Sequence, residues 1–132
     1  MLIQIDRDLI LWPVAVHLAL IVFLYAWLSL VRKHQREGRD VRALEARVSA
    51  TLSNQFEAPV LFYALVAMVW AGEMVNSLYF ILAWVFIVGR LWHFYVATLS
   101  ADIIRRGLVF TINFLAIFAM WALFLFQRLI LS

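Results

Sequence analysis

Four long apolar runs follow one another along the chain, and polar stretches separate them. The first, residues 9–31, carries no formal charge and is long enough, at about 1.5 Å per residue, to cross a bilayer core of about 30 Å. Similar runs predict further helices over 43–72, 77–98 and 106–130. We therefore predict an all-α integral membrane four-helix bundle in which successive helices run up and down.

The stretch 32–47 is basic and polar, and it connects the first two predicted helices. Leu44, Val48 and Leu52 recur at helical spacing from within this stretch onward. The second helix is therefore predicted to begin in water, so that only its later part lies in the membrane.

Composition supports a single membrane domain, residues 1–132. Hydrophobic residues make up 67% of the chain and charged residues 14%, whereas soluble domains have about 45–50% and about 25%. The sequence has no cysteine, which excludes a disulfide framework, a thiolate zinc site and a cysteine nucleophile. No spacing of metal ligands is present either, so no metal site is predicted.

Lysines and arginines are distributed unequally between the two sides that the predicted helices define. Six lie in the connection 32–47, and Arg105 and Arg106 lie between the last two helices. The opposite side holds Arg7 and Arg128. Because cytoplasmic connections carry the excess of basic residues, we expect an inner-membrane protein with both termini on the non-cytoplasmic side. The orientation of the helices in the membrane accounts for the distribution of basic residues, so no nucleic-acid partner is expected.

Several polar side chains are expected inside the membrane, where ionisable groups are costly and are functional or paired. Asn54 and Glu57 are three residues apart and share a helix face, and Arg90 and His93 have the same spacing. The predicted topology brings residues from three helices to one layer near the cytoplasmic side. These residues are Arg47, Asn54, Glu57, Arg90, His93 and Arg106.

Such a layer is suited to a small zwitterionic molecule with anionic groups. Arginines bind carboxylates in fork geometry, Glu57 would accept an ammonium group, and Asn54 would bond an amide. The alternative is structural, with Glu57 neutralising an arginine between helices and Asn54 joining helices by hydrogen bonds. The spacing alone is compatible with both.

Two further polar residues fall within the apolar runs. His17 lies in the middle of the first run and is interpreted as a packed, hydrogen-bonded histidine. Asn113, in the fourth run, is interpreted as forming interhelical hydrogen bonds. The sequence assigns neither residue a further role.

Two motifs contain most of the polar residues expected in the membrane. In RVSATLSNQFEAP, residues 47–59, an arginine lies seven positions before an asparagine, and a glutamate lies three after it. GRLWH, residues 89–93, has an Arg-x-x-His pattern, and Arg106 comes sixteen residues after Arg90. These features resemble the second-helix signature, the third-helix pattern and the fourth-helix arginine of the MAPEG family (membrane-associated proteins in eicosanoid and glutathione metabolism), in a bacterial-type member.

This resemblance implies a homotrimer in the lipid bilayer, with glutathione as co-substrate bound between neighbouring subunits near the cytoplasmic face. Arg106 would be catalytic, because a positive charge stabilises the glutathione thiolate. Arg32 is a looser match to a further family arginine. The glutathione-binding residues would be Arg32, Arg47, Asn54, Glu57, Arg90 and His93.

The chain departs from the family pattern near the expected thiol. Gly107 stands where some members carry serine, and Phe110 where some carry tyrosine. Ala97 stands where a tyrosine is often found. Fewer hydroxyl groups are therefore expected beside the thiol, so the resemblance implies no specific eicosanoid reaction.

Three functions follow from these residues as hypotheses. The first is a glutathione-dependent transferase or peroxidase acting on lipophilic electrophiles or lipid hydroperoxides. The second is a non-catalytic trimeric membrane scaffold of the same fold. The third is a small cation exporter in which Glu57 is the proton-coupled carboxylate. The hydrophobic co-substrate is not specified, because its binding surface would consist of apolar side chains facing lipid.

Overall fold

The computed structural model describes residues 2–99 and 103–131, and the side chains of Ile103 and Arg106 lie outside that description. The described chain is helical apart from turns, short irregular segments and one isolated bridge between Gln4 and Asn76. Its elements in chain order are η1 (Arg7–Ile10), α1 (Leu11–Arg36), α2 (Arg42–Asn54), α3 (Ala58–Ala71), α4 (Ser77–Leu99) and α5 (Ile103–Leu129).

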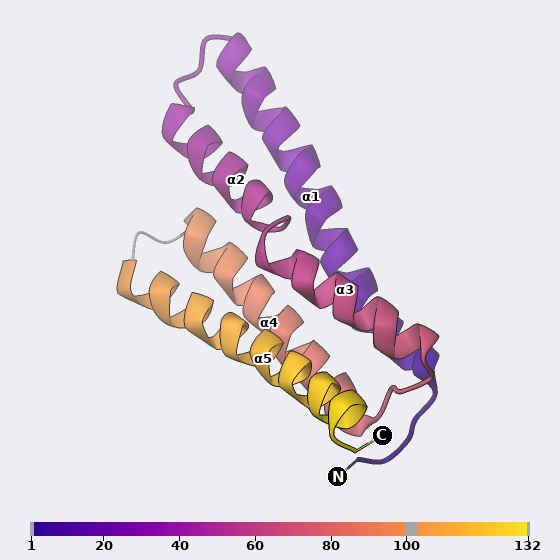
Figure 1. Cartoon of the computed structure of the whole chain (residues 1–132). Helices are drawn as coiled ribbons and strands as arrows, with labels where there is room; N and C mark the ends of the chain where they lie inside the picture. Colours follow the sequence, from indigo (N-terminus) through magenta and orange to yellow (C-terminus); the bar gives the residue numbers. More distant parts are fainter. Residues whose placement is uncertain (1, 100–102, 132) are drawn as a thin grey trace.

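The helices form two neighbouring pairs (Figure 1). α1 and α2 lie side by side and extend past α4 and α5, which form the second pair, and the chain ends lie together at the opposite end of the molecule. Within residues 2–99 and 103–131, four segments are long and apolar enough to cross a membrane, which confirms the predicted fold class. They are Arg7–Arg36, Arg42–Ala71, Ser77–Leu99 and Gly107–Leu129.

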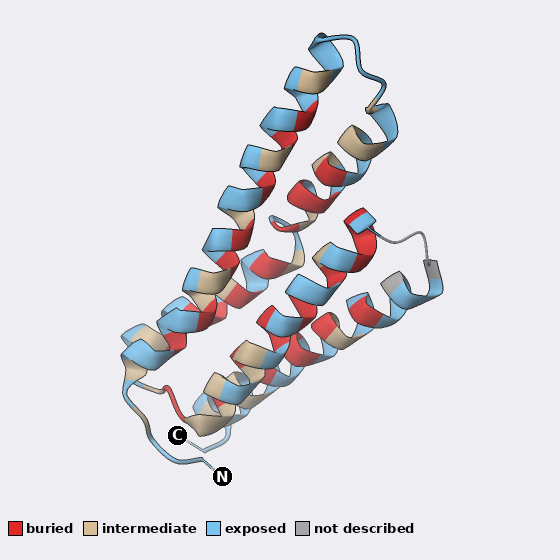
Figure 2. Cartoon of the chain, turned by 180° about the vertical axis from the view of Figure 1, so that it is seen from behind, coloured by how far each residue is buried: buried red, intermediate tan, exposed pale blue. Residues whose placement is uncertain are grey.

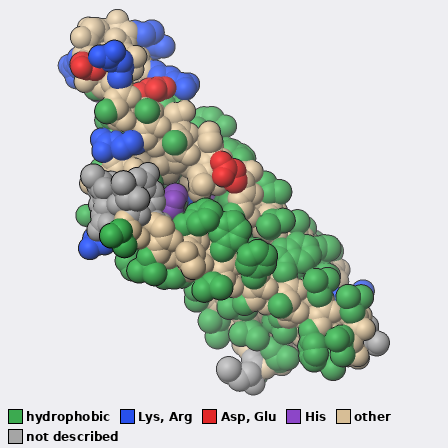
Figure 3. Space-filling model, turned by 60° about the vertical axis from the view of Figure 1, so that its left-hand side comes forward, with side chains coloured by type: hydrophobic (Ala, Val, Ile, Leu, Met, Phe, Trp, Pro, Cys, Tyr) green, Lys and Arg blue, Asp and Glu red, His purple; other side chains and the backbone are tan. Residues whose placement is uncertain are grey.

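Buried side chains line the inner faces of the helices, while the outer faces are exposed (Figure 2). Phe62 on α3 stacks on Phe86 of α4 with ring centroids 4.7 Å apart, and Ile117 of α5 belongs to the same core. Leu24 of α1 and Val48 of α2 belong to a second core cluster. Hydrophobic side chains cover most of the flank shown in Figure 3, whereas lysines and arginines gather at the α1–α2 end. An apolar exterior of this kind is typical of a protein surrounded by lipid.

The second membrane segment differs from the single helix predicted over 43–72. It consists of α2 and α3, which are separated by three residues, 55–57. Pro59 lies in the first turn of α3. It has no N–H to donate to the carbonyl of Gln55, and in a continuous helix its ring would clash with that carbonyl. At the break the backbone forms turns that are tighter than those of an α-helix. Phe56 N–H donates to Ser53 O, and Glu57 N–H donates to Asn54 O.

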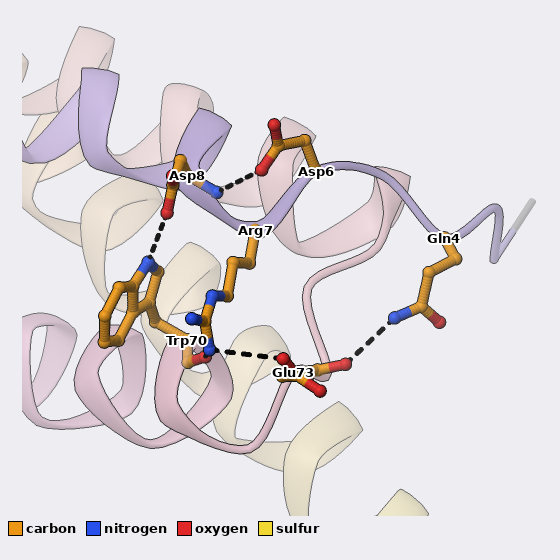
Figure 4. Close-up of polar contacts among 6 residues, drawn as sticks. All are labelled: Gln4, Asp6, Arg7, Asp8, Trp70 and Glu73. Atoms are coloured by element: carbon orange, nitrogen blue, oxygen red, sulfur yellow. Dashed lines mark hydrogen bonds and ion pairs between the residues drawn. The ribbon is translucent and has the colours of Figure 1, made fainter.

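A cluster of polar contacts holds the N-terminal segment against the end of α3, opposite the α1–α2 connection (Figures 1 and 4). The Trp70 indole N–H donates to Asp8 at 2.9 Å, and the Arg7 guanidinium lies 4.3 Å from the centroid of the Trp70 ring. Arg7 also pairs with Glu73 at 3.5 Å, and the Gln4 amide donates to the Glu73 carbonyl. These contacts join the start of the chain to the turn after α3.

Candidate functional site

A cavity of about 330 Å³ opens between α2 and α4 at the level where the polar layer is predicted. Small side chains on both helices leave this space, and polar side chains reach it from each helix. Of the predicted site residues, Arg47, Asn54 and His93 line the cavity. Arg47 is exposed, whereas His93 is buried. The remaining lining residues are Ala46, Ala50, Thr51 and Ala97.

Arg90 lies next to this cavity and is completely buried. One of its terminal nitrogens, Nη2, donates to the side-chain oxygen of Asn54, and Nε donates to Oε1 of Gln55 at 3.3 Å. The other terminal nitrogen, Nη1, is buried without a hydrogen-bond partner among the described residues. No carboxylate in the described part of the chain forms an ion pair with Arg90. A buried, unpaired guanidinium is costly, and it attracts an anion.

Asn54 connects Arg90 to Glu57. Its amide nitrogen donates to Glu57 Oε2 at 3.4 Å, while its amide oxygen accepts from Arg90. Glu57 is exposed at the break between α2 and α3. The buried cation of Arg90 and the exposed anion of Glu57 are therefore both hydrogen-bonded to the Asn54 amide. The Glu57 carboxylate is the one that is open to a ligand.

Behind Arg90, a buried hydrogen-bonded chain crosses the bundle to α1. Gln55 Oε1 accepts from His17 Nε2 at 2.8 Å as well as from Arg90. His17 Nδ1 is bonded to the Tyr63 hydroxyl, so the partners assign the proton to Nε2. His17 and Gln55 are 0% and 1% exposed, which makes this contact part of the interior rather than of a lipid-facing surface.

Gln55 was not predicted to be part of this site. His17 was predicted to be a packed, hydrogen-bonded histidine, and its contacts with Gln55 and Tyr63 confirm this. The signal for Gln55 was its place directly after Asn54 and four before Pro59, where a helix ends. The signal for His17 was an ionisable group in the middle of an apolar run. At the end of α2 the Gln55 side chain contacts His17 of α1 and Arg90 of α4, and a periodic helix pattern contains no information about such contacts.

The structure does not place Arg32 or Arg106 at the cavity. Arg32 pairs with Glu45 at 3.0 Å near the end of the α1–α2 hairpin, where both line a different cavity. Arg106 lies in the first turn of α5, and its side chain is outside the described part of the structure. Gly107 and Phe110, at two of the positions that depart from the family pattern, are exposed.

Asn113 of α5 lies against Gly89 of α4, and a Cβ atom at Gly89 would overlap the Asn113 side-chain oxygen. The Asn113 amide is buried, yet neither its oxygen nor its nitrogen has a hydrogen-bond partner among the described residues. The interhelical hydrogen bonds predicted for Asn113 are therefore not formed within the described chain. The Asn113 side chain instead lies against the backbone of α4 at Gly89.

Comparison with known proteins gives one match, to a family. The family model of the MAPEG family matches residues 9–126. No curated protein and no solved structure matches the chain. The matched segment contains all four membrane segments except their outermost residues, together with the cavity and the polar contacts around Arg90. The chain therefore belongs to the MAPEG family.

Proposed function

We propose that this protein binds glutathione in the cavity between α2 and α4 and uses the glutathione thiolate on lipophilic electrophiles or lipid hydroperoxides. The family includes glutathione transferases and peroxidases, which supports this reaction class. The observation that carries the proposal is Arg90, whose buried Nη1 has no partner among the described residues. An anionic group of a ligand would satisfy that nitrogen and neutralise the guanidinium.

The charges around the cavity complement those of glutathione, which has two carboxylates, one ammonium group and two amides. Arg47 and Arg90 supply positive charge for carboxylates, and exposed Glu57 supplies negative charge for the ammonium group. Asn54 lies between these charges and offers an amide. Arg106, at the start of α5, is proposed to stabilise the thiolate.

Glu57→Gln is expected to weaken glutathione binding at least about tenfold, or about 1.4 kcal/mol, while changing ionisation of the bound thiol much less. The substitution keeps the hydrogen bond to Asn54 but removes the charge that faces the ammonium group. Calorimetric titration of the purified protein measures the affinity, and thiolate absorbance measures the ionisation.

A suitable control for this variant is Glu73→Gln, which removes a carboxylate from the turn after α3, at the far end of the molecule. Glutathione affinity should remain that of the parent in this control. Equal affinities of parent and Glu57→Gln would show that Glu57 does not contact the ammonium group. No detectable binding by the parent protein would contradict the proposed function itself.

The second candidate is a membrane scaffold without catalysis. The observation in its favour is the buried chain from Tyr63 through His17 and Gln55 to Arg90, because it joins α1, α3 and α4 irrespective of any ligand. A scaffold would not bind glutathione, so the same titration separates the two functions.

We also propose a homotrimer with the second membrane segments around its central axis. Phe56 and Glu57 are exposed at the helix break, where an irregular backbone at membrane depth needs neighbouring protein or water. Native mass spectrometry from detergent is expected to give the mass of three chains. Monomers or dimers as the sole species would contradict this assembly.

Both termini are proposed to face the non-cytoplasmic side. The basis is the excess of basic residues in the α1–α2 connection and before α5. Alkaline phosphatase fused to the C-terminus should be active, because this enzyme folds only outside the cytoplasm. Activity of a C-terminal reporter that functions only in the cytoplasm would contradict this topology.

A further inference from the structure

Neutral oxygens alone anchor the guanidinium of Arg90 within the described chain. They are the side-chain and backbone oxygens of Asn54 and Oε1 of Gln55. Buried arginines in proteins are usually paired with a carboxylate, which cancels the charge. Here amide groups fix the orientation of the guanidinium and leave its charge in place.

Gln55 cannot turn its amide without losing hydrogen bonds. Its nitrogen donates to the Thr51 carbonyl at 2.9 Å, so its oxygen must face Arg90 and His17. His17 Nε2 donates to this oxygen, while the Tyr63 hydroxyl holds the other ring nitrogen. Three helices therefore fix one amide oxygen against the Nε of Arg90.

A glutamate at position 55 would have nearly the same shape and could accept the hydrogen bonds from His17 and Arg90. It could not donate to the Thr51 carbonyl as the Gln55 amide does, and its negative charge would lie about 3.3 Å from the Arg90 Nε and would neutralise the guanidinium. In a low-dielectric interior this pairing is strong and would compete with an anionic ligand. The neutral amide is thus the property of Gln55 that bears on ligand binding.

We propose that Gln55, held by His17 and Thr51, is a positioning residue that orients Arg90 without neutralising it and so makes the site selective for a ligand carboxylate. This inference rests on the proposed glutathione function, and it adds the residue that sets charge selectivity. A purely structural Gln55 would affect every ligand of the cavity alike, whereas a residue that controls charge would affect anionic ligands selectively.

The test compares glutathione with its two monoethyl esters, in each of which one carboxylate is neutral. The parent should bind glutathione at least about tenfold more tightly than one of these esters, because Arg90 contacts that carboxylate. In Gln55→Glu this preference should fall to within about threefold, through weaker binding of glutathione rather than tighter binding of the ester. Gln55→Glu should unfold at a higher temperature than Gln55→Leu, since both variants lose the hydrogen bond to Thr51 but only the glutamate pairs with Arg90.

Gln127→Glu is the matched control. Gln127 accepts a hydrogen bond from the Tyr79 hydroxyl at 2.7 Å near the C-terminal end of α5, so the same atoms change far from the cavity. The ligand preference of this variant should match the parent. Gln55→Leu should weaken both ligands but retain the preference, because it removes an acceptor without adding charge.

Four outcomes are decisive. If Gln55→Glu keeps the parent's preference, or loses both ligands equally, the inference is wrong while the proposed function stands. If Gln55→Glu unfolds more than about 5 °C below Gln55→Leu, its carboxylate is not paired with Arg90 and the inference is also wrong. If the parent itself does not bind glutathione, the proposed function fails and this inference fails with it.

Discussion

Arg90→Met is expected to lower the affinity for glutathione at least about 100-fold, or about 2.7 kcal/mol, without lowering thermal stability. Hydrogen bonds from a charged group contribute about 1.5–3 kcal/mol each, and the ligand would lose both the bonds and the buried charge. Stability should not suffer, because methionine fills a similar volume and removes a guanidinium that no carboxylate in the described chain neutralises. Gln55 would keep His17 as its donor.

Calorimetric titration and thermal unfolding of the same preparation test this expectation together. Arg128→Met, in the last turn of α5, is the control for the substitution itself, and its affinity should equal that of the parent. A folded Arg90→Met protein that binds glutathione within threefold of the parent would show that Arg90 only packs the bundle. A large loss of stability in this variant would show that the Arg90 charge stabilises the fold rather than awaiting a ligand.

Arg106→Ala is expected to abolish the thiolate absorbance of bound glutathione at neutral pH while leaving the affinity within about tenfold, or about 1.4 kcal/mol. A thiol bound in an apolar setting is difficult to ionise, because desolvation raises its pKa. A guanidinium at the start of α5 opposes that rise, and the positive end of the helix dipole acts in the same direction. Gly107 and Phe110 have no hydroxyl group that could replace it.

The neighbouring Arg105→Ala provides the control, since it removes the same charge from the same turn of α5. Thiolate absorbance and turnover of an electrophilic aryl halide should remain close to those of the parent in this control. If Arg106→Ala turns over the aryl halide as fast as the parent does, Arg106 only anchors the helix end. The thiolate would then be stabilised by another group.

The membrane segments could be predicted from the sequence because each depends on a sum over about twenty residues. The uncharged run 9–31 and the fourth run mark two membrane segments despite isolated polar residues such as His17 and Asn113. Helical spacing likewise predicted that Asn54 would share a face with Arg47, and both line the cavity with His93.

The contacts around Arg90 could not be predicted, because they depend on a local break in a helix. Pro59 shows that the helix is perturbed, but not that Gln55 turns toward α1 and α4. Gln55, one of the two partners of His17, lies 38 residues away, and a single sequence contains no pattern that predicts such a pair. The position of Arg32 at a helix end likewise does not reveal that Glu45 would pair with it, and a role of Arg32 in glutathione binding stays a prediction.

The break between α2 and α3 also bears on how the chain enters the membrane during synthesis. With 13 and 14 residues, the two helices are each only about 20 Å long, which is less than the bilayer core. Neither half can therefore serve as an independent insertion signal, and α2 is the more polar half. The two helices reach the length of a membrane span only together, as the segment Arg42–Ala71. A nascent chain that ends before α4 also lacks Arg90, so the side-chain oxygens of Asn54 and Gln55 would not yet have the guanidinium that they bind.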